Sequence, residues 1–210
     1  MASTKDLTTT SYALLGLLAI KPWSAYELAG QMKRGFPWFW PRAERAIYAE
    51  PKNLERHGLA RASTEHRGRR ARTVYTITPA GRDALRRWLG EPSAPPRFES
   101  ESLVRLTFLE HGSPEDVAPA LDALRAAAAE IEAIVATVSG EYGAGRGPFV
   151  ERLPQVALGG SFIAALAALF RDYAEWAEAF CEACEAGDGR AIALDRLATL
   201  NEAVHGSERP

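Results

Sequence analysis

The sequence has few cysteines and no long hydrophobic run. Its 210 residues include two cysteines, too few for the disulfide framework of a small secreted domain. The apolar stretch at residues 12–20 is shorter than the roughly 20 residues that a membrane helix needs, and residues 1–5 lack the pattern of a secretory signal. These absences argue against secreted and membrane-spanning classes, so we expect a cytoplasmic protein without a membrane partner.

The common signatures of enzyme active sites are also missing. No Ser-His-Asp, metal-ligand or paired-carboxylate arrangement stands out, and "GAGRGP" at 143–148 matches neither a dinucleotide-binding nor a phosphate-binding loop. Cys181 and Cys184 have redox or zinc spacing, but no second cysteine pair or suitably spaced histidine accompanies them. Acidic neighbours would raise the pKa of either thiol. We expect a protein that is not an enzyme and has no cofactor and no metal; the cysteines are interpreted as helix packing, with a thiol sensor as the alternative.

Charge is unevenly divided along the chain, although the net charge is only -2. Residues 1–90 carry 16 Lys and Arg against 7 Asp and Glu, a net charge of +9, and residues 91–210 carry 9 against 20, a net charge of −11. The Pro-rich stretch "GEPSAPPRF" at 90–98 separates them. We predict a basic domain at 1–90 that binds nucleic acid, a linker at 91–98, and an acidic domain at 99–210 with another task.

Three helices are predicted in the first part of the basic domain. Residues 8–20 have helical apolar spacing, and Ser24 with Glu27 forms an S-x-x-E capping box that marks the start of a second helix. A third helix is expected to begin near Pro41 and to end at Gly58, because proline suits the first turn and glycine the C-cap. The second and third helices are close enough in sequence for a helix-turn-helix.

One face of the third helix is basic. Four side chains lie within about 80° of one another when each residue advances about 100° around the axis: Arg45, Tyr48, Lys52 and Arg56. Such a face can reach phosphates and base edges in a DNA groove, although a solvated amphipathic helix has the same pattern. Pro51 lacks a backbone N–H, so we expect a kink near residues 48–50 or a break into two segments.

Two strands and a fourth helix complete the basic domain. Residues 60–66 and 73–78 have strand character, and Gly68 supplies the turn between them. Thr78 and Pro79 begin the fourth helix. The order helix–helix–helix–strand–turn–strand–helix predicts a winged helix-turn-helix, in which the third helix enters the major groove and the hairpin flanks it. Four arginines would then meet phosphates or the minor groove, unless they belong to an ordinary solvated loop: Arg67, Arg69, Arg70 and Arg72.

Two stretches of the basic domain, "IYAEPKNLERHGL" and "YTITPAGRDAL", resemble the PadR family of transcriptional regulators. The family pattern is I-Y-x-x-L-x-x-L-E-x-x-G-L, a basic wing, and then Y-x-L-T-x-x-G. The matching residues are Ile47, Tyr48, Leu54, Glu55, Gly58, Leu59, Tyr75, Thr78 and Gly81. Pro51 replaces the usual Leu, so details of the reading helix do not carry over.

This resemblance covers residues 8–90 closely. It covers the rest more loosely, as the subgroup with a long helical C-terminal domain like that of virulence-gene activators. The family resemblance implies DNA binding by the winged helix and dimerisation through the C-terminal region. The predicted fold class is therefore mostly α, with an N-terminal winged helix-turn-helix, a two-stranded wing and a C-terminal α-helical dimerisation domain.

The acidic domain contains two coiled-coil-like seams, in which apolar residues alternate at spacings of four and three. The first seam is Val117, Leu121, Leu124, Ala128, Ile131, Val135 and Val138, and the second is Phe162, Leu166, Leu169, Tyr173, Trp176 and Phe180. Their similar lengths favour an antiparallel helix pair that packs against its copy in a homodimer; one monomeric bundle is the alternative. The predicted dimer contacts are Leu121, Leu124, Ile131, Val135, Phe162, Leu166, Leu169, Tyr173 and Trp176.

An aromatic cluster spans residues 36–40. It either lines a cavity for a small hydrophobic or aromatic effector or forms core between the reading head and the dimer arm. The candidate lining residues are Trp38, Trp40, Trp88 and Phe98.

We expect a sequence-specific DNA-binding transcriptional regulator, a repressor acting as a homodimer on a pseudo-palindromic operator of double-stranded DNA. The alternatives are an activator, or a winged-helix protein-interaction module that does not read DNA. The candidate DNA contacts are Ser24, Tyr26, Arg42, Arg45, Tyr48, Lys52, Asn53, Arg56, Arg67, Arg69, Arg70 and Arg72.

Overall fold

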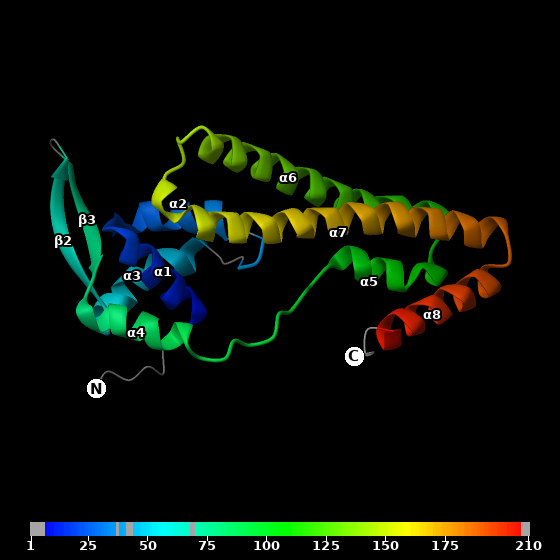
Figure 1. The fold of residues 1–210 in the computed structure, drawn as a ribbon, viewed down its shortest axis with the longest axis horizontal. Helices are drawn as coiled ribbons and strands as arrows, with labels where there is room; N and C mark the ends of the chain where they lie inside the picture. The colour runs from blue at the N-terminus through cyan, green and yellow to red at the C-terminus, as the bar shows by residue number, and fades with distance from the viewer. Residues whose placement is uncertain (1–6, 37, 41–43, 68–69, 207–210) are drawn as a thin grey trace. The chain divides into compact units, whose positions relative to one another are not determined.

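The chain forms two compact units, Met1–Pro96 and Arg97–Pro210, which we call the N-terminal unit and the helical unit. The computed structural model describes residues 7–36, 38–40, 44–67 and 70–206. The N-terminal unit combines helices with a small sheet, and the helical unit contains helices without a strand among its described residues (Figure 1). The chain is mostly helical, as the sequence predicted.

The N-terminal unit follows the predicted order of helices and strands (Figure 1). Its helices are α1 (Thr9–Ile20), α2 (Ala25–Gly35), α3 (Glu44–Arg56) and α4 (Pro79–Leu89). Its strands are β1 (Trp23–Ser24), β2 (Ala60–Arg67) and β3 (Arg70–Ile77).

Local sequence signals set the ends of these helices. The hydroxyl of Ser24 accepts the backbone N–H of Glu27 and the Glu27 carboxylate accepts the N–H of Ser24, the predicted capping box of α2. At the end of α3, Gly58 has φ +68 and the N–H of Leu59 bonds the carbonyl of Leu54 at 2.9 Å. This glycine C-cap is a Schellman motif, which satisfies carbonyls that the helix leaves free.

The sheet has three antiparallel strands in the order β1-β3-β2. The hairpin runs in register from Ala60 opposite Ile77 to Arg67 opposite Arg70, and Trp23 lies opposite Tyr75. The sequence predicted the two hairpin strands but not β1, because a strand of two residues has no alternation to detect.

Five leucines form the centre of the N-terminal unit: Leu14, Leu15, Leu18, Leu28 and Leu54, none more than 1% exposed. Gly81 lies where α4 crosses the start of the wing, and a Cβ at this position would lie 2.1 Å from the carbonyl oxygen of Leu59. Glycine at this position therefore allows α4 to pack against the base of the hairpin.

Helix α3 is continuous through Pro51. The predicted break into two segments is therefore wrong. Pro51 is fully buried, and the neighbouring apolar residues Ile47 and Leu54 are 3% and 0% exposed. The apolar face of the helix thus remains packed in the core on both sides of the proline, which offsets the hydrogen bond that the proline cannot donate.

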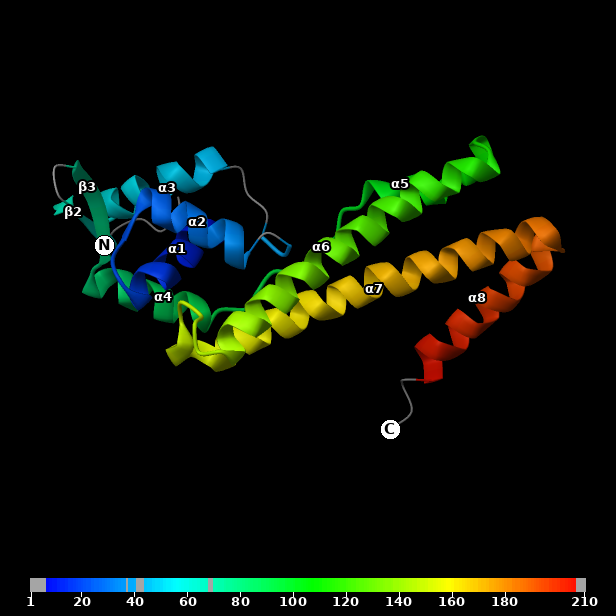
Figure 2. The same cartoon turned by 90° about the horizontal axis from the view of Figure 1, so that it is seen from above.

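The helical unit contains two long helices that lie side by side and run in opposite directions, as both ribbon views show (Figures 1 and 2). They are α6 (Val117–Gly143) and α7 (Leu153–Ala186), flanked by α5 (Glu101–Thr107) and α8 (Gly189–Gly206). Short 3-10 turns, η2 (Leu109–His111), η3 (Pro114–Asp116) and η4 (Val150–Arg152), precede α6 and α7.

The two long helices bury side chains of different size, large apolar residues as well as alanines on α6 and alanines on α7. On α6 the predicted seam is buried: Leu121, Leu124 and Ile131 are no more than 5% exposed, and Val135 is half-buried. On α7 the buried residues are Ala167, Ala174 and Ala177. The three α6 residues therefore contribute to the core of a single chain.

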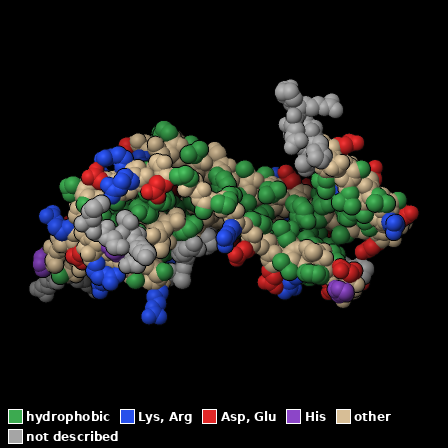
Figure 3. Space-filling view, turned by 90° about the horizontal axis from the view of Figure 1, so that it is seen from below, with side chains coloured by type: hydrophobic (Ala, Val, Ile, Leu, Met, Phe, Trp, Pro, Cys, Tyr) green, Lys and Arg blue, Asp and Glu red, His purple; other side chains and the backbone are tan. Residues whose placement is uncertain are grey.

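Large side chains of the α7 seam remain accessible within one chain. Phe162, Leu169 and Trp176 are 54%, 58% and 37% exposed, and Leu166 and Tyr173 are half-buried. Figure 3 shows hydrophobic side chains gathered on the helical unit, at the right of the view. We call Phe162, Leu169 and Trp176 the exposed α7 face.

The segment Val150–Ala186 is long and apolar enough to cross a membrane by length and composition, and little of its most apolar part is buried. The sequence expectation that no stretch reaches this length is wrong, because alanines and glycines between the large residues extend the apolar segment. This is weak evidence for a membrane span, since apolar helices of soluble proteins meet the same criteria.

Candidate nucleic-acid interface

Helix α3 presents a basic surface opposite its buried side. Arg45, Lys52 and Arg56 are exposed, and Tyr48 is 37% exposed. In the part of the chain that the structure describes, no carboxylate pairs with Arg45 or Lys52. We call these four residues the reading face. Unpaired cations on a helix held by a buried apolar side are suited to phosphates and base edges.

Next to the reading face, hydrogen bonds fix the side chain of Asn53. Its Nδ2 donates to Glu50 Oε1 at 2.9 Å, and its Oδ1 accepts from Arg56 at 2.6 Å. The same Glu50 oxygen accepts from the Ser11 hydroxyl of α1 at 2.6 Å. Sequence reasoning assigned no role to Glu50. The spacing of three residues along α3 could have suggested the contacts of Asn53, but nothing in the sequence pairs Glu50 with Ser11.

The start of α2 carries two further predicted contacts. Ser24 is half-buried, and its hydroxyl caps the helix and donates to Glu27 Oε2 at 2.8 Å. Tyr26 is 77% exposed on the first turn. Ser24 therefore positions α2, whereas the side chain of Tyr26 is accessible to a partner.

The hairpin places Arg67 and Arg70 opposite each other at the end of the two strands. The predicted contacts Arg42 and Arg69 lie outside the described residues. The backbone register thus brings two of the predicted wing arginines to one end of the sheet, beyond the buried Val74 and Tyr75 that anchor β3.

Arg72 differs from the other predicted wing contacts. Its guanidinium contacts Glu27 of α2 and Glu65 of β2, each at 3.0 Å. The backbone N–H of Ser24 is the main cause that lowers the pKa of Glu27, and Arg72 lowers it further. Because two carboxylates hold this guanidinium, Arg72 links the hairpin to α2.

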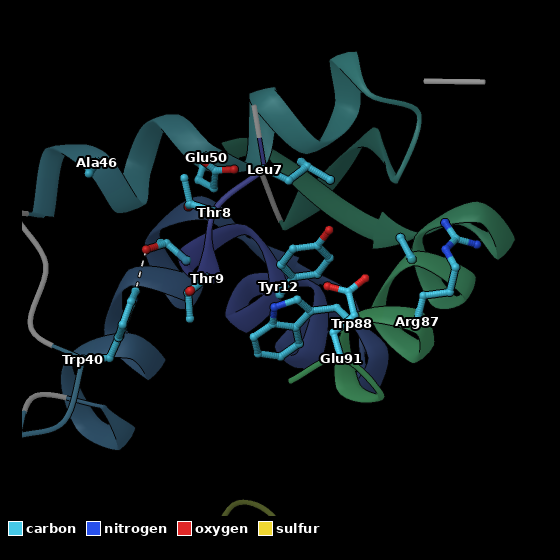
Figure 4. A pocket seen from close by; sticks show the side chains of 12 residues that line it. Leu7, Thr8, Thr9, Tyr12, Trp40, Ala46, Glu50, Arg87, Trp88 and Glu91 are labelled. Carbon is cyan, nitrogen blue, oxygen red and sulfur yellow. Dashed lines mark hydrogen bonds between the residues drawn. The ribbon is translucent and has the colours of Figure 1, made fainter. Parts of the chain in front are cut away.

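A cavity of about 900 Å³ lies among α1, α3 and α4 in the N-terminal unit. Tyr12 and Trp88 stack at 4.9 Å between ring centroids, and Trp40 donates to the Thr10 hydroxyl at 3.0 Å (Figure 4). Figure 4 shows Trp40 at the left, the Tyr12–Trp88 pair near the centre and Arg87 at the right. Of the four predicted lining residues, the cavity brings together Trp40 and Trp88.

The other two predicted lining residues lie elsewhere. Phe98 packs on Phe170 of the helical unit at 5.9 Å between ring centroids, because it follows the Pro-rich stretch into that unit. Trp38 does not line the cavity, and its indole Nε1 is buried without a hydrogen-bond partner.

The described residues contain no group of three His, Cys, Asp or Glu side chains arranged to hold a metal ion. Cys181 and Cys184 are free and half-buried, and burial raises the pKa of Cys181.

Residues 14–87 match the model of the family described as "Transcriptional regulator PadR-like family". Over 88 residues the chain is 36% identical to "Probable transcriptional regulator Rv1176c" of Mycobacterium tuberculosis, a match that covers 41% of this chain and 46% of that protein. Over 100 residues it is 29% identical to "Negative transcriptional regulator PadR" of Bacillus subtilis, covering 47% and 55%. The chain spans about half the length of these curated relatives.

The fold is also similar to solved structures. The crystal structure of Bacillus subtilis PadR in complex with operator DNA has a TM-score of 0.68 at 22% identity, covering 83% of this chain and 99% of that chain. The same protein in complex with p-coumaric acid has a TM-score of 0.61 at 20% identity, covering 84% and 100%. At these identities the likeness shows a shared fold.

Proposed function

We propose that the protein is a sequence-specific DNA-binding regulator that acts as a homodimer, since residues 14–87 match the model of the PadR-like family of transcriptional regulators. The observation that carries the proposal is the reading face of α3. Its cations project from a helix whose opposite side is buried, so the backbone can orient them against base edges. Arg67 and Arg70 would add phosphate contacts from the hairpin.

The exposed α7 face supports the homodimer. Phe162 and Leu169 are each more than half exposed in one chain, and apolar patches of this kind mark surfaces that another molecule covers. A two-fold dimer presents two reading helices, which matches a pseudo-palindromic operator with half-sites about 34–36 Å apart or a multiple of that distance. Binding to genomic DNA would place the protein in the cytoplasm.

We expect the regulator to repress, since a winged helix bound at an operator competes with other proteins for the same DNA, and one relative is named a negative regulator. Activation is the alternative within the same fold. A protein-interaction module without DNA reading is the alternative of another class, and burial of the reading face against a protein partner would favour it.

Selection from a pool of randomised duplex DNA tests the proposal. The protein should enrich one pseudo-palindrome, and the complex should contain two chains for each duplex. Binding at equal affinity to the enriched and scrambled duplexes would contradict sequence-specific reading. Absence of binding to either duplex would favour the interaction module.

A small aromatic effector is a second proposed partner, because the cavity gathers Tyr12, Trp40 and Trp88 beside Arg87. Aromatic walls suit a planar ring, and Arg87 supplies a cation in a lining that also holds the carboxylates of Glu50 and Glu91. Since one neighbour was crystallised with p-coumaric acid, this acid is a reasonable probe. It should quench tryptophan fluorescence of the unaltered chain at micromolar concentration and bind the Trp88→Ala variant more weakly. Equal titrations of the two proteins would reject this cavity as the site.

A further inference from the structure

A half-buried carboxylate connects the reading helix to the core. Glu50 Oε1 accepts from Ser11 Oγ at 2.6 Å and from Asn53 Nδ2 at 2.9 Å. Ser11 is 0% exposed, and its Oγ accepts the backbone N–H of Thr8 at 2.8 Å. Asn53 Oδ1 in turn accepts from exposed Arg56 at 2.6 Å. One continuous set of hydrogen bonds therefore runs from the buried start of α1 to the reading face.

This network permits a single orientation of the Asn53 amide. A carboxylate only accepts hydrogen bonds and a guanidinium only donates them. The amide NH₂ must therefore face Glu50 and the amide oxygen must face Arg56, and a flipped amide would lose both bonds. Asn53 is thus fixed before any ligand arrives.

The fixed amide keeps hydrogen-bonding capacity for a partner. An amide has two N–H donors and two acceptor lone pairs, and the network uses one of each. One N–H donor and one acceptor lone pair remain. In the major groove, adenine presents the matching pair, an acceptor at N7 and a donor at N6. Arg56 keeps further N–H groups for a guanine edge or a phosphate.

We propose that Glu50 is a positioning residue for DNA reading, which holds Asn53, and through Asn53 also Arg56, in one arrangement on α3. This inference rests on the proposed function. Without Glu50, both side chains would sample several rotamers, and binding would carry the entropic cost of ordering them. Glu50, a residue of α3, also lines the cavity, so its side chain contacts both the buried Ser11 and the cavity.

The test compares Glu50→Ala, Glu50→Gln and Asn53→Ala on three kinds of duplex: the one selected by the unaltered protein, its single base-pair variants, and a scrambled duplex. Glu50→Ala should raise the Kd for the selected duplex roughly tenfold and remove discrimination at one base pair, because it releases one base-reading group. The Kd for the scrambled duplex should not change. Glu50→Gln should restore discrimination, because its amide oxygen can still accept from Asn53.

Two comparisons separate positioning from a structural role. The double variant Glu50→Ala/Asn53→Ala should lose no more affinity than Asn53→Ala alone, because both changes act through one group. Thr10→Val is the matched control: it removes the half-buried hydrogen bond that Trp40 donates to Thr10, the neighbour of Ser11 in α1, without touching the Asn53 network. It should lower the melting temperature and leave discrimination intact.

Additive losses in the double variant would overturn the inference. Equal weakening by Glu50→Ala on selected and scrambled duplexes would also overturn it. In either case the unaltered protein still discriminates, so the proposed function survives. If the unaltered protein itself shows no discrimination, the proposed function fails, and the positioning role fails with it.

Discussion

The two units bury apolar side chains in different ways. In the N-terminal unit, the core centres on five leucines of α1, α2 and α3 that are at most 1% exposed, and alanine plays a minor part: Leu14, Leu15, Leu18, Leu28 and Leu54. In the helical unit, the buried face of α7 consists of alanines, while Phe162 and Leu169 remain more than half exposed. The first unit completes its core within one chain, and the second leaves its largest α7 side chains for another surface.

This difference indicates a division of tasks. A core that is complete in one chain can hold the reading face at a fixed geometry, which base reading requires. An apolar helix face that stays largely accessible in its own chain favours association, because burying it removes apolar area from water at about 25 cal/mol per Å².

A charge on the exposed α7 face should separate the chains. Leu169→Glu would place an unpaired carboxylate in the proposed interface, which is strongly unfavourable. Light scattering at micromolar concentration should change from about twice 22.9 kDa to 22.9 kDa. Ala126→Glu adds the same charge at an exposed position of α6 and should leave the dimer intact. A mass near 22.9 kDa for the unaltered chain at every concentration would reject the dimer.

Replacing a leucine by alanine should reduce stability in both units, but only in the helical unit should the loss depend on protein concentration. Leu28→Ala should lower the free energy of unfolding of the N-terminal unit by about 2–5 kcal/mol, equally at all protein concentrations. Leu169→Ala should lower the melting temperature of the helical unit more at low concentration than at high, since association stabilises that unit. Chemical and thermal unfolding over a hundredfold dilution series would measure both. If the loss of stability depended on protein concentration in the same way for both variants, the proposed division of tasks between the units would be contradicted.

Within the N-terminal unit, helix and hairpin arginines should act differently on DNA. Arg45→Ala or Lys52→Ala should cost about 1–3 kcal/mol on the selected duplex and relax one base pair. Arg67→Ala should weaken all duplexes alike and lower the salt slope by about one unit. Titrations at several salt concentrations distinguish these outcomes. If the hairpin variant loses discrimination and the helix variants keep it, the roles are reversed.

The smallest expected effect belongs to Arg72, whose side chain is 37% exposed. The folded state lowers the pKa of Glu27 from its ordinary value of 4.5, so this carboxylate stabilises the fold above pH 4.5 and loses that contribution as the pH falls through the lowered value. Arg72→Ala removes part of this contribution. Its melting temperature should be below that of the unaltered protein at pH 7, and the gap should narrow towards pH 3. A constant gap would show that Arg72 acts by packing instead.

Signals between residues close in the sequence predicted most of the helices and strands. The capping box at Ser24, the C-cap at Gly58 and the alternation in β3 each depend on residues within one element, and each is present in the structure. The missing N–H of Pro51 predicted a kink or a break, and the break is wrong, because the burial of Ile47 and Leu54 on either side keeps the helix continuous. Tertiary packing decided that element.

The candidate site was less predictable, because long-range pairing sets the state of each charged group. The sequence predicted DNA contacts for both Arg45, on the third helix, and Arg72, in the wing. The structure leaves the first without a carboxylate partner among the described residues and holds the second between Glu27 and Glu65. Likewise, one stretch supplied both Trp38 and Trp40, yet only Trp40 reaches the cavity. Contacts between distant segments leave no periodic signal in a single sequence.

A footprint of the unaltered protein and the Leu169→Glu variant on the selected duplex tests the central claim most directly. The account predicts two protected half-sites for the unaltered protein, with centres about 34–36 Å apart or a multiple of that distance. It predicts one protected half-site for the variant, with the same base preference, because the reading unit is complete in a single chain. Loss of base preference in the variant, or a single protected half-site for the unaltered dimer, would contradict it.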